Sequence, residues 1–381
     1  MPKRRLLFVV DSLNIGGAEK SITTLLPLLP AEKFDIDLLL TARGGKLECL
    51  VPPHVTIRQL PTHSPGPAGR MAYTIRRALM SLTCRLQPDR ARKPDFFWRL
   101  FGGGIPMHPE TYDVAIAWHQ GLPTFYVDSK VRARRKMAWI NAEVHSSDTT
   151  LALLGSVYGR YDTVVAVSEI LRGQILSRMP GLRDKMTVIN DIVNIDSIMT
   201  MAGETSPYPA GSPLVLLTVG RLEQVKGQDI AIEACRLLRE RDIPFHWYFV
   251  GGGSLHSTLS RMIGEYGLTD SVTLCGATSN PYPYMKYCDI YIQPSRHEGY
   301  GIALYEARVF RRPLITTDFP VARTHVNTDT GIICPTTPDG IADAVTSLCA
   351  PGSRERFYRS SASTSEEHNR KSLESVINHL L

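Results

Sequence analysis

Short apolar runs recur along the whole chain, and longer amphipathic patterns separate them. The runs are only a few residues long and rich in β-branched and aromatic side chains, as is typical of strands buried on both faces of a sheet. Strands are predicted at residues 6–10, 34–41, 114–118, 137–140, 163–167, 186–189, 214–219, 245–250, 272–274, 290–293, 313–316 and 331–334. The alternation of strand and helix predicts an α/β fold in which helices cover parallel sheets.

The strand pattern restarts after a stretch rich in proline, glycine and serine, SPYPAGSP at residues 206–213. With 381 residues, the chain is too long for one ordinary hydrophobic core. We therefore expect an N-terminal α/β domain over residues 1–205 and a second one over 206–350. The remaining segment, 351–381, has a serine-rich start and ends in a helical pattern.

Composition places the chain among globular proteins, with 43% hydrophobic and 21% charged residues. These values exclude a disordered, a fibrous or a membrane-spanning chain. The seven cysteines are scattered and form no CxxC pair, which favours a reducing compartment. The apolar start, Leu6–Val10, ends at Asp11, too early for a signal peptide, so a cytoplasmic protein is expected.

The net charge of +6 is unevenly distributed along the chain. Residues 1–205 carry +7 and residues 206–381 carry −1. Much of the excess lies in Arg70–Arg99, where basic residues alternate with apolar and aromatic ones. This pattern favours peripheral contact with anionic lipid at the inner face of the plasma membrane. The alternative is an ordinary helix with arginines on its solvent face.

The stretch with the most chemical content is RHEGYGIALYE, Arg296 to Glu306, which follows the predicted strand 290–293. Ligands bind at the carboxyl ends of strands in open α/β sheets, and the two glycines let backbone N–H groups approach an anion. Glu298 should precede the next helix and Glu306 should lie in its second turn. Two separated carboxylates suit an extended ligand such as a nucleotide sugar, although two solvated glutamates are the simpler alternative.

Two basic residues follow another predicted strand, in the sequence GRLEQVKG at residues 220–227. Arg221 and Lys226 are five positions apart on one loop, so both charges can reach a single phosphate group. Near the N-terminus, Gly16 and Gly17 open a predicted helix and could also approach a phosphate or merely permit a tight turn. The triplet Asp35-Ile-Asp37 could hold a metal, but its alternation with apolar residues favours a structural role.

Several of these motifs together resemble the family-4 glycosyltransferases of the GT-B fold. The likeness is carried by GRLEQVKG, by FVGGG at 249–253, by residues 280–307 with the spacing E-x7-E, and by PLITTD at 313–318. This resemblance implies two Rossmann-like domains facing each other across a cleft. It also implies a hexosyltransferase that retains the anomeric configuration, needs no metal and takes a nucleoside-diphosphate sugar as donor.

The resemblance assigns roles to particular positions. Arg221 and Lys226 would neutralise the donor diphosphate as it leaves, while Glu298 would contact the transferred sugar and act with them as the catalytic group. Nucleotide-sugar binding would also involve Glu306, which would hold the ribose, and backbone donors at Gly299, Tyr300 and Gly301. Gly16 and Gly17 would close over the phosphates from the opposite domain. Residues 351–381 would pack back on the N-terminal domain.

The acceptor side departs from the family pattern, because Asn141 stands where relatives often have a histidine. His119 and His145 could supply an imidazole instead, or could be ordinary loop histidines. The expected function is transfer of a hexose to a saccharide or lipid-linked acceptor in cell-surface polysaccharide or glycoconjugate synthesis. A GT-B epimerase or phosphorylase and a non-catalytic nucleotide-sugar binder are the alternatives, and no nucleic acid is expected as a partner.

Overall fold

The structure is a computed structural model, and it describes residues 2–87, 94–142, 148–358 and 363–381. The chain divides into two compact units. The first comprises Met1–Asn14, Ala18–Ile192 and Lys371–Leu381, and the second comprises Ile15–Gly17 and Val193–Arg370. The boundary between the units thus follows Ile192, and the C-terminal residues group with the first unit.

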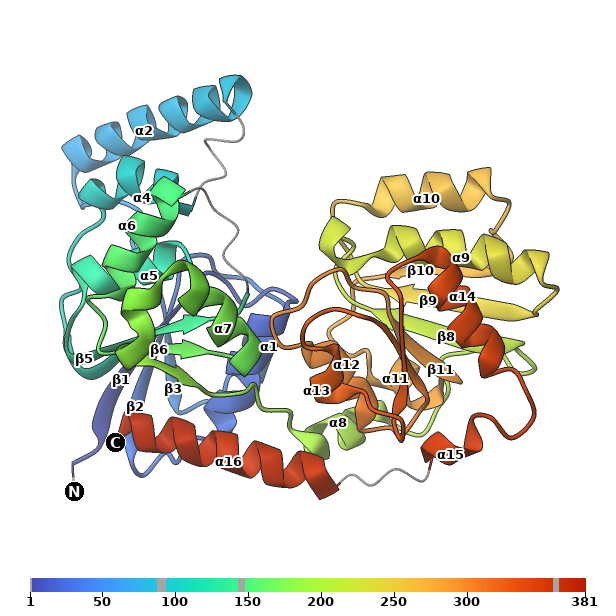
Figure 1. The fold of residues 1–381 in the computed structure, drawn as a ribbon. Helices are drawn as coiled ribbons and strands as arrows, with labels where there is room; N and C mark the ends of the chain where they lie inside the picture. Colours follow the sequence, from blue (N-terminus) through green and yellow to red (C-terminus); the bar gives the residue numbers. More distant parts are fainter. Residues whose placement is uncertain (1, 88–93, 143–147, 359–362) are drawn as a thin grey trace. The chain divides into compact units, whose positions relative to one another are not determined.

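A parallel sheet forms the centre of the first unit (Figure 1). Among the described residues its strand order is β3-β2-β1-β4-β5-β6-β7. The strands are β1 (Arg4–Val10), β2 (Phe34–Leu40), β3 (Val55–Gln59), β4 (Thr111–Ala117), β5 (Arg132–Ile140), β6 (Thr163–Ala166) and β7 (Met186–Val188). The helices are α1 (Gly17–Leu25), α2 (Pro67–Leu86), α4 (Pro94–Phe101), α5 (Leu122–Lys130), α6 (Asp148–Tyr158) and α7 (Glu169–Arg178), with 3-10 turns η1 (Leu26–Leu28), η2 (Glu48–Leu50), η3 (Gly102–Gly104) and η4 (Pro180–Lys185).

The second unit is also built on a parallel sheet, and its described strands are ordered β10-β9-β8-β11-β12-β13 (Figure 1). They are β8 (Leu214–Val219), β9 (Phe245–Val250), β10 (Val272–Gly276), β11 (Ile290–Gln293), β12 (Leu314–Thr317) and β13 (Gly331–Cys334). The helices are α8 (Ile195–Ala202), α9 (Gln228–Glu240), α10 (His256–Glu265), α11 (Tyr282–Tyr287), α12 (Ile302–Arg308), α13 (Ala322–His325), α14 (Pro338–Ser347) and α15 (Glu355–Tyr358), with the 3-10 turn η5 (Gln224–Lys226). The last helix, α16 (Ser363–Leu380), begins in this unit, and its residues from Lys371 onward group with the first unit.

Burial explains why the apolar runs form strands. In β1 the residues from Leu6 to Val10 are at most 1% exposed, and the core of the second unit is built around Trp247 and Phe249 of β9. The predicted α/β class with two parallel sheets is therefore confirmed. The sequence pattern missed β3, because this strand lies at the sheet edge and most of its residues are only partly buried.

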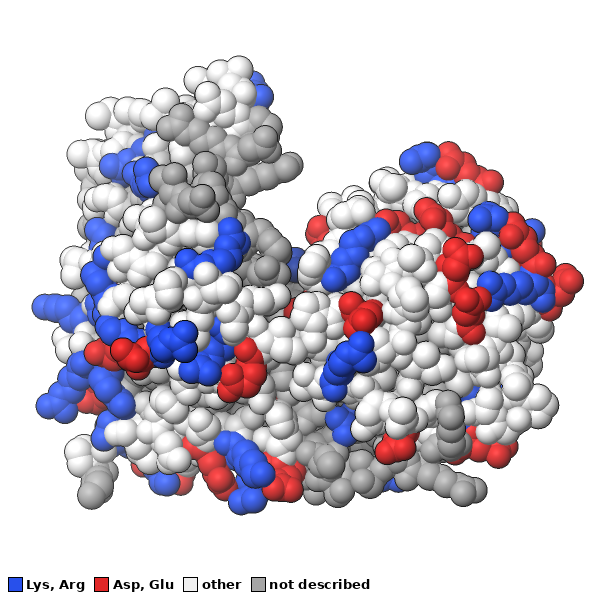
Figure 2. All heavy atoms as spheres, viewed as in Figure 1, with Lys and Arg blue, Asp and Glu red and all other residues white. Residues whose placement is uncertain are grey.

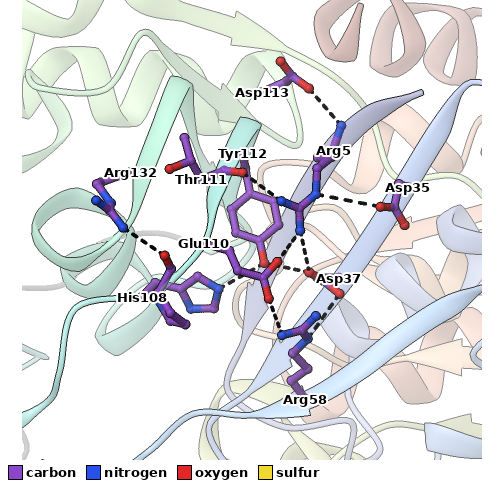
Figure 3. Close-up of polar contacts among 11 residues, drawn as sticks. Arg5, Asp35, Asp37, Arg58, His108, Glu110, Thr111, Tyr112, Asp113 and Arg132 are labelled. Atoms are coloured by element: carbon purple, nitrogen blue, oxygen red, sulfur yellow. Dashed lines mark hydrogen bonds and ion pairs between the residues drawn. The ribbon is translucent and has the colours of Figure 1, made fainter. Parts of the chain in front are cut away.

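A polar network joins the first four strands of the first sheet (Figure 3). Asp37 of β2 is buried, accepts a hydrogen bond of 2.6 Å from the Tyr112 hydroxyl and lies 3.3 Å from Arg58 Nε. Arg58 also pairs with Glu110 at 2.6 Å, and Arg5 pairs with the same glutamate. Because these donors compensate the Asp37 carboxylate, the contacts are those of a structural ion network rather than of a metal site.

Candidate functional site

The two motifs with the most chemical content meet where the second sheet reverses its strand order. This reversal lies between β8 and β11, which are neighbours in the sheet but far apart in sequence. Residues 220–227 follow β8, and residues 294–301 follow β11. A crevice forms at such a switch point because the two loops leave the sheet on opposite sides, and ligands of open α/β sheets bind there.

The loop after β8 packs closely against two neighbouring loops, and glycines make this possible. A Cβ atom on Gly227 would lie 2.0 Å from the Pro294 carbonyl oxygen, and Gly227 has a φ of +66°. A Cβ atom on Gly251 would lie 1.8 Å from the carbonyl oxygen of Gly220. Any larger side chain at these positions would therefore move the loop that carries Arg221 and Lys226.

An ion pair fixes the same loop to the segment after β11. Arg296 donates from both terminal nitrogens to Asp229, at 2.8 Å and 2.7 Å, and also to the Gln224 carbonyl at 2.7 Å. The Arg296 backbone N–H donates to the Val225 carbonyl at 2.8 Å. Burial alone would raise the Asp229 pKa, but the pairing with Arg296 outweighs it and holds this pKa below its ordinary value. This role of Arg296 was not predicted, since nothing along the chain links it to Asp229.

The structure brings Lys226 and Glu298 into direct contact. Lys226 Nζ donates to one oxygen of Glu298 at 2.6 Å, while the other oxygen accepts from Gln293 at 3.0 Å and from Ser295 at 2.8 Å. Three donors thus fix the direction of the Glu298 carboxylate. Arg221 lies on the same loop as Lys226, and its side chain is exposed. A cation and an anion are therefore fixed beside the Gly299–Gly301 turn.

Glu306 lies inside helix α12 and is only 3% exposed. One of its carboxylate oxygens accepts a hydrogen bond of 2.8 Å from the hydroxyl of Tyr282, which is also buried. Burial and the Glu306 charge raise the Tyr282 pKa, so the phenol stays protonated and remains a donor. Glu306 is thus held by a tyrosine from the NPYPY stretch, a contact that the sequence did not predict.

The turn Gly299–Gly301 rests on a cluster of rings. His325 Nε2 lies 2.6 Å from the Tyr300 carbonyl oxygen, and the Tyr300 hydroxyl lies 2.9 Å from His368 Nε2. Tyr305 packs against both histidines. Burial lowers the His325 pKa to about 4, so this imidazole is neutral near pH 7 and its Nε2 carries the hydrogen that the carbonyl accepts.

In the first unit the order of the sheet reverses between β1 and β4, and His119 lies just past the carboxyl end of β4. Its Nδ1 accepts a long hydrogen bond of 3.4 Å from the Asp11 N–H, and its Nε2 lies 3.5 Å from a Glu19 oxygen. Burial raises the Asp11 pKa, and His119 opposes that shift. Asp11 and Glu19 were not recognised as candidates, although both flank the Gly16-Gly17 motif in the sequence.

Asn141 follows β5 and donates through Nδ2 to the Trp118 carbonyl at 2.6 Å. Its Oδ1 atom is buried and has no hydrogen-bond partner among the described residues. His145 lies outside the described residues, so the structure does not place it. Gly16 precedes α1 and Gly17 begins it, and both group with the second unit.

In its described residues the basic segment contains the helices α2 and α4, and α2 is unusual in its exposure. None of its residues is buried, and the large apolar side chains on one stripe are 48% to 71% exposed: Met71, Ile75, Leu79, Leu82 and Leu86. Arg76 lies against Gly104, whereas Arg70, Arg77 and Arg85 are exposed. Arg90, Arg92 and Lys93 lie outside the described residues. Figure 2 shows mainly basic side chains on the first unit and mixed charges on the second.

A protein metal site requires a cluster of ligand side chains, and crossing a membrane with a helix requires a long apolar helix. Across residues 2–87, 94–142, 148–358 and 363–381, no group of three or more histidine, cysteine, aspartate or glutamate side chains is arranged to hold a metal ion. Within the same ranges, no helix combines the length and the apolar character that crossing a bilayer requires. The helix α2 is amphipathic rather than uniformly apolar.

A comparison with known protein families matches the part of the chain that contains the two loops at the switch point of the second sheet. Residues 207–363 match the family model of glycosyl transferases group 1. This glycosyl transferases group 1 segment contains both loops, with Arg221, Lys226, Glu298 and Glu306. It covers about two fifths of the chain.

Two relatives of known name match the chain over different lengths. The alpha-D-kanosaminyltransferase of Streptomyces kanamyceticus is 35% identical over 154 residues, which cover 39% of this chain and 40% of the relative. A longer match, 24% identical over 315 residues, covers 83% of this chain and 81% of the N-acetylgalactosamine-N,N'-diacetylbacillosaminyl-diphospho-undecaprenol 4-alpha-N-acetylgalactosaminyltransferase of Campylobacter jejuni. The more similar match thus spans only about two fifths of its relative's length.

Solved structures match the whole chain. The crystal structure of Anabaena HepE in complex with UDP and glucose has a TM-score of 0.74 and 15% sequence identity, and the match covers 99% of both chains. This likeness, together with the two parallel sheets, shows that the chain has the GT-B fold. The fold that the sequence motifs predicted is confirmed.

Proposed function

We propose that this protein is a retaining glycosyltransferase that moves a hexose from a nucleoside-diphosphate sugar to a saccharide or lipid-linked acceptor. Its place would be in cell-surface polysaccharide or glycoconjugate synthesis. The observation that carries the proposal is the contact between Lys226 and Glu298 beside the Gly299–Gly301 turn, within the glycosyl transferases group 1 segment. The names of both relatives, which describe glycosyl transfer, support it.

In this proposal the diphosphate binds beside Lys226 and Arg221. An ammonium group has three N–H donors, and Glu298 takes one of them, so Lys226 can contact a phosphate oxygen without losing the glutamate. Arg221 adds a second fixed charge from an exposed position on the same loop. Both charges would stabilise the leaving nucleoside diphosphate in the transition state, where negative charge develops on its oxygens.

Glu298 would act on the sugar, and Glu306 on the ribose. The fixed direction of the Glu298 carboxylate suits hydrogen bonds from sugar hydroxyls, and its charge would favour an oxocarbenium-like transition state. Glu306 is nearly buried, so a ribose hydroxyl would have to reach it at the start of α12, beside the Tyr282 hydroxyl. Gly16 and Gly17 remain proposed phosphate contacts, and His119 and Asn141 remain proposed acceptor-side residues.

The direct test is incubation with UDP-, GDP- and ADP-sugars in the presence of saccharides or a membrane lipid extract. Acceptor-dependent release of a nucleoside diphosphate, with the donor's anomeric configuration kept in the product by NMR, is the expected result. Conversion of the donor into its epimer would point to the epimerase alternative. Nucleotide binding without any turnover would point to a non-catalytic binder, and neither outcome would be compatible with the proposal.

Comparing the activities of two lysine variants tests whether the transfer reaction depends on this site. Lys226→Ala removes the ammonium that pairs with Glu298, and Lys286→Ala removes a lysine of the same unit that bonds Gly203 and Glu204 instead. Transfer should fall strongly in the first variant and stay near wild type in the second. Equal activity in both variants would show that Lys226 has no role in the chemistry.

We also propose that α2 binds the surface of an anionic membrane, which would bring the enzyme to a lipid-linked acceptor. The apolar stripe from Met71 to Leu86 is exposed, and α2 carries four arginines and no acidic residue. Such a helix lies in the headgroup region with its apolar side inserted and its arginines near anionic lipid. The exposed stripe supports insertion more directly than the arginines do, because Arg76 faces the body of the unit.

Vesicle sedimentation tests this membrane contact. Wild type should bind vesicles of phosphatidylglycerol and phosphatidylcholine, and a Leu79→Ser, Leu82→Ser variant should lose most of that binding. Leu50→Ser is the matched control, because Leu50 is an exposed leucine of the first unit outside α2. Equal binding by the α2 variant and the control would refute the role of the stripe.

A further inference from the structure

The Gly299–Gly301 turn, which is proposed to receive the donor, is held in place by His325 and His368, two side chains that lie outside the sequence motifs. Tyr300, its middle residue, is only 3% exposed and has a hydroxyl group that lies 2.9 Å from His368 Nε2. The two rings are nearly parallel, with an interplanar angle of 11°. His368 belongs to the C-terminal helix α16, far along the chain from the turn. The contact therefore links the turn to a distant element.

A second anchor on α16 strengthens this link. Asn369 accepts hydrogen bonds at 3.2 Å from both the Tyr305 hydroxyl and the Val193 N–H, and it donates to the Val193 carbonyl at 2.6 Å. An amide side chain that bonds both backbone groups of one residue has little freedom to shift. Neighbouring His368 is consequently fixed in position against Tyr300.

The turn is fixed from its backbone side as well. The Tyr300 carbonyl accepts from buried His325, whose ring also packs on Tyr300 with centroids 4.8 Å apart. Gly301, the next residue, has a φ of +88°, and a Cβ atom on it would lie 3.5 Å from Cδ2 of the His325 ring. Both the carbonyl and the hydroxyl of Tyr300 thus have partners, and together they set the direction of the backbone from Gly299 to Gly301.

We propose that His368 is a positioning residue for the donor: through the Tyr300 hydroxyl, α16 holds the Gly299–Gly301 turn in the shape that binds the diphosphate. This inference rests on the proposed function, because it assumes that the turn contacts the donor. His368 itself would touch neither the nucleotide nor the sugar. Its loss would let the turn sample other conformations, and only a fraction of the protein would then be competent to bind.

Two variants remove the contact in different ways. Tyr300→Phe deletes the hydroxyl and keeps the ring, so the fold should survive, while His368→Leu removes the partner nitrogen. Each should weaken binding of UDP, or of whichever nucleoside diphosphate the wild type binds, by about five- to tenfold in calorimetry. His368→Gln, whose amide can still bond a hydroxyl, should recover most of the affinity.

Tyr208→Phe is the matched control, because it deletes a hydroxyl bond of 2.8 Å to the Tyr284 carbonyl elsewhere in the same unit. It should lower thermal stability without changing nucleotide affinity. A purely structural role for His368 would give the same pattern in His368→Leu: lower stability with unchanged affinity. That result would overturn the proposal.

Hydrogen exchange without nucleotide separates this inference from the proposed function. The amides of Gly299, Tyr300 and Gly301 should exchange faster in Tyr300→Phe than in wild type, whereas Tyr208→Phe should leave them unchanged. Unaltered exchange in Tyr300→Phe would overturn the positioning role, whether or not a nucleotide binds. Faster exchange in Tyr300→Phe, together with a wild type that binds none of UDP, GDP and ADP, would instead refute the proposed function and, with it, the role of His368 in donor binding.

Discussion

Acid should destabilise the second unit through one buried histidine. His325 is neutral in the folded protein because burial lowers its pKa from 6.5 to about 4. In the unfolded chain the imidazole takes up a proton as the pH falls through about 6.5. The folded state resists this protonation until about pH 4, so the stability present above pH 6.5 is lost progressively between these two values.

The size of the effect follows from the two pKa values. At about pH 5 nearly all unfolded chains carry a proton on His325, whereas only about a tenth of the folded molecules do. Relative to about pH 7, the free energy of unfolding should therefore fall by about 2 kcal/mol from this group. Below about pH 4 the total loss approaches roughly 3 kcal/mol, because each unit of pKa shift corresponds to about 1.4 kcal/mol.

The comparison variant is His325→Gln, since its amide N–H can donate to the Tyr300 carbonyl but does not titrate. Native-state hydrogen exchange of peptides that contain β11 reports the free energy of unfolding of the second unit, after correction for the intrinsic exchange rate. Other titrating groups affect wild type and variant alike and cancel in the difference. The variant should lose about 2 kcal/mol less than wild type between about pH 7 and pH 5. Parallel pH profiles would refute the reasoning.

Four further predictions concern the site and the first unit. Lys226→Ala and Glu306→Ala should each weaken nucleotide binding about ten- to a hundredfold in calorimetry, because each removes a charged hydrogen-bonding group; unchanged affinity in both would contradict their roles. Glu298→Gln should lower kcat about a hundredfold and change donor affinity less, as steady-state kinetics would show, whereas weaker donor affinity with an unchanged kcat would mean that Glu298 contributes only uniform binding. Asp37→Asn should cost about 1 to 3 kcal/mol in urea denaturation, because it weakens the bonds to Arg58 and Tyr112. Asp191→Asn should stabilise the first unit by roughly 2 to 4 kcal/mol at about pH 8, because burial raises the Asp191 pKa to about 7 and opposes its ionisation, and no gain in hydrogen-exchange protection of β1 would contradict this.

The sequence by itself determined the local structure and much of the chemistry. Buried strands of a parallel sheet are continuous apolar runs, so almost every strand was recognisable, and the edge strand β3 was missed because its residues are partly exposed. The residues of the two loops could also be recognised, because glycines and charges directly after a buried strand are typical of loops that bind anionic ligands. Helix α12 begins where the glycine turn predicted, at Ile302.

Only the tertiary structure decided which of these residues meet. Lys226 and Glu298 are 72 positions apart, and their contact exists because β8 and β11 are neighbours in the sheet. Tyr300 and His368 are 68 positions apart and meet because α16 returns to the turn. Spacing along the chain fixes geometry within one helix or strand, but it carries no information about strand order. The pairing of the charges, and the support beneath the turn, could therefore be known only from the folded chain.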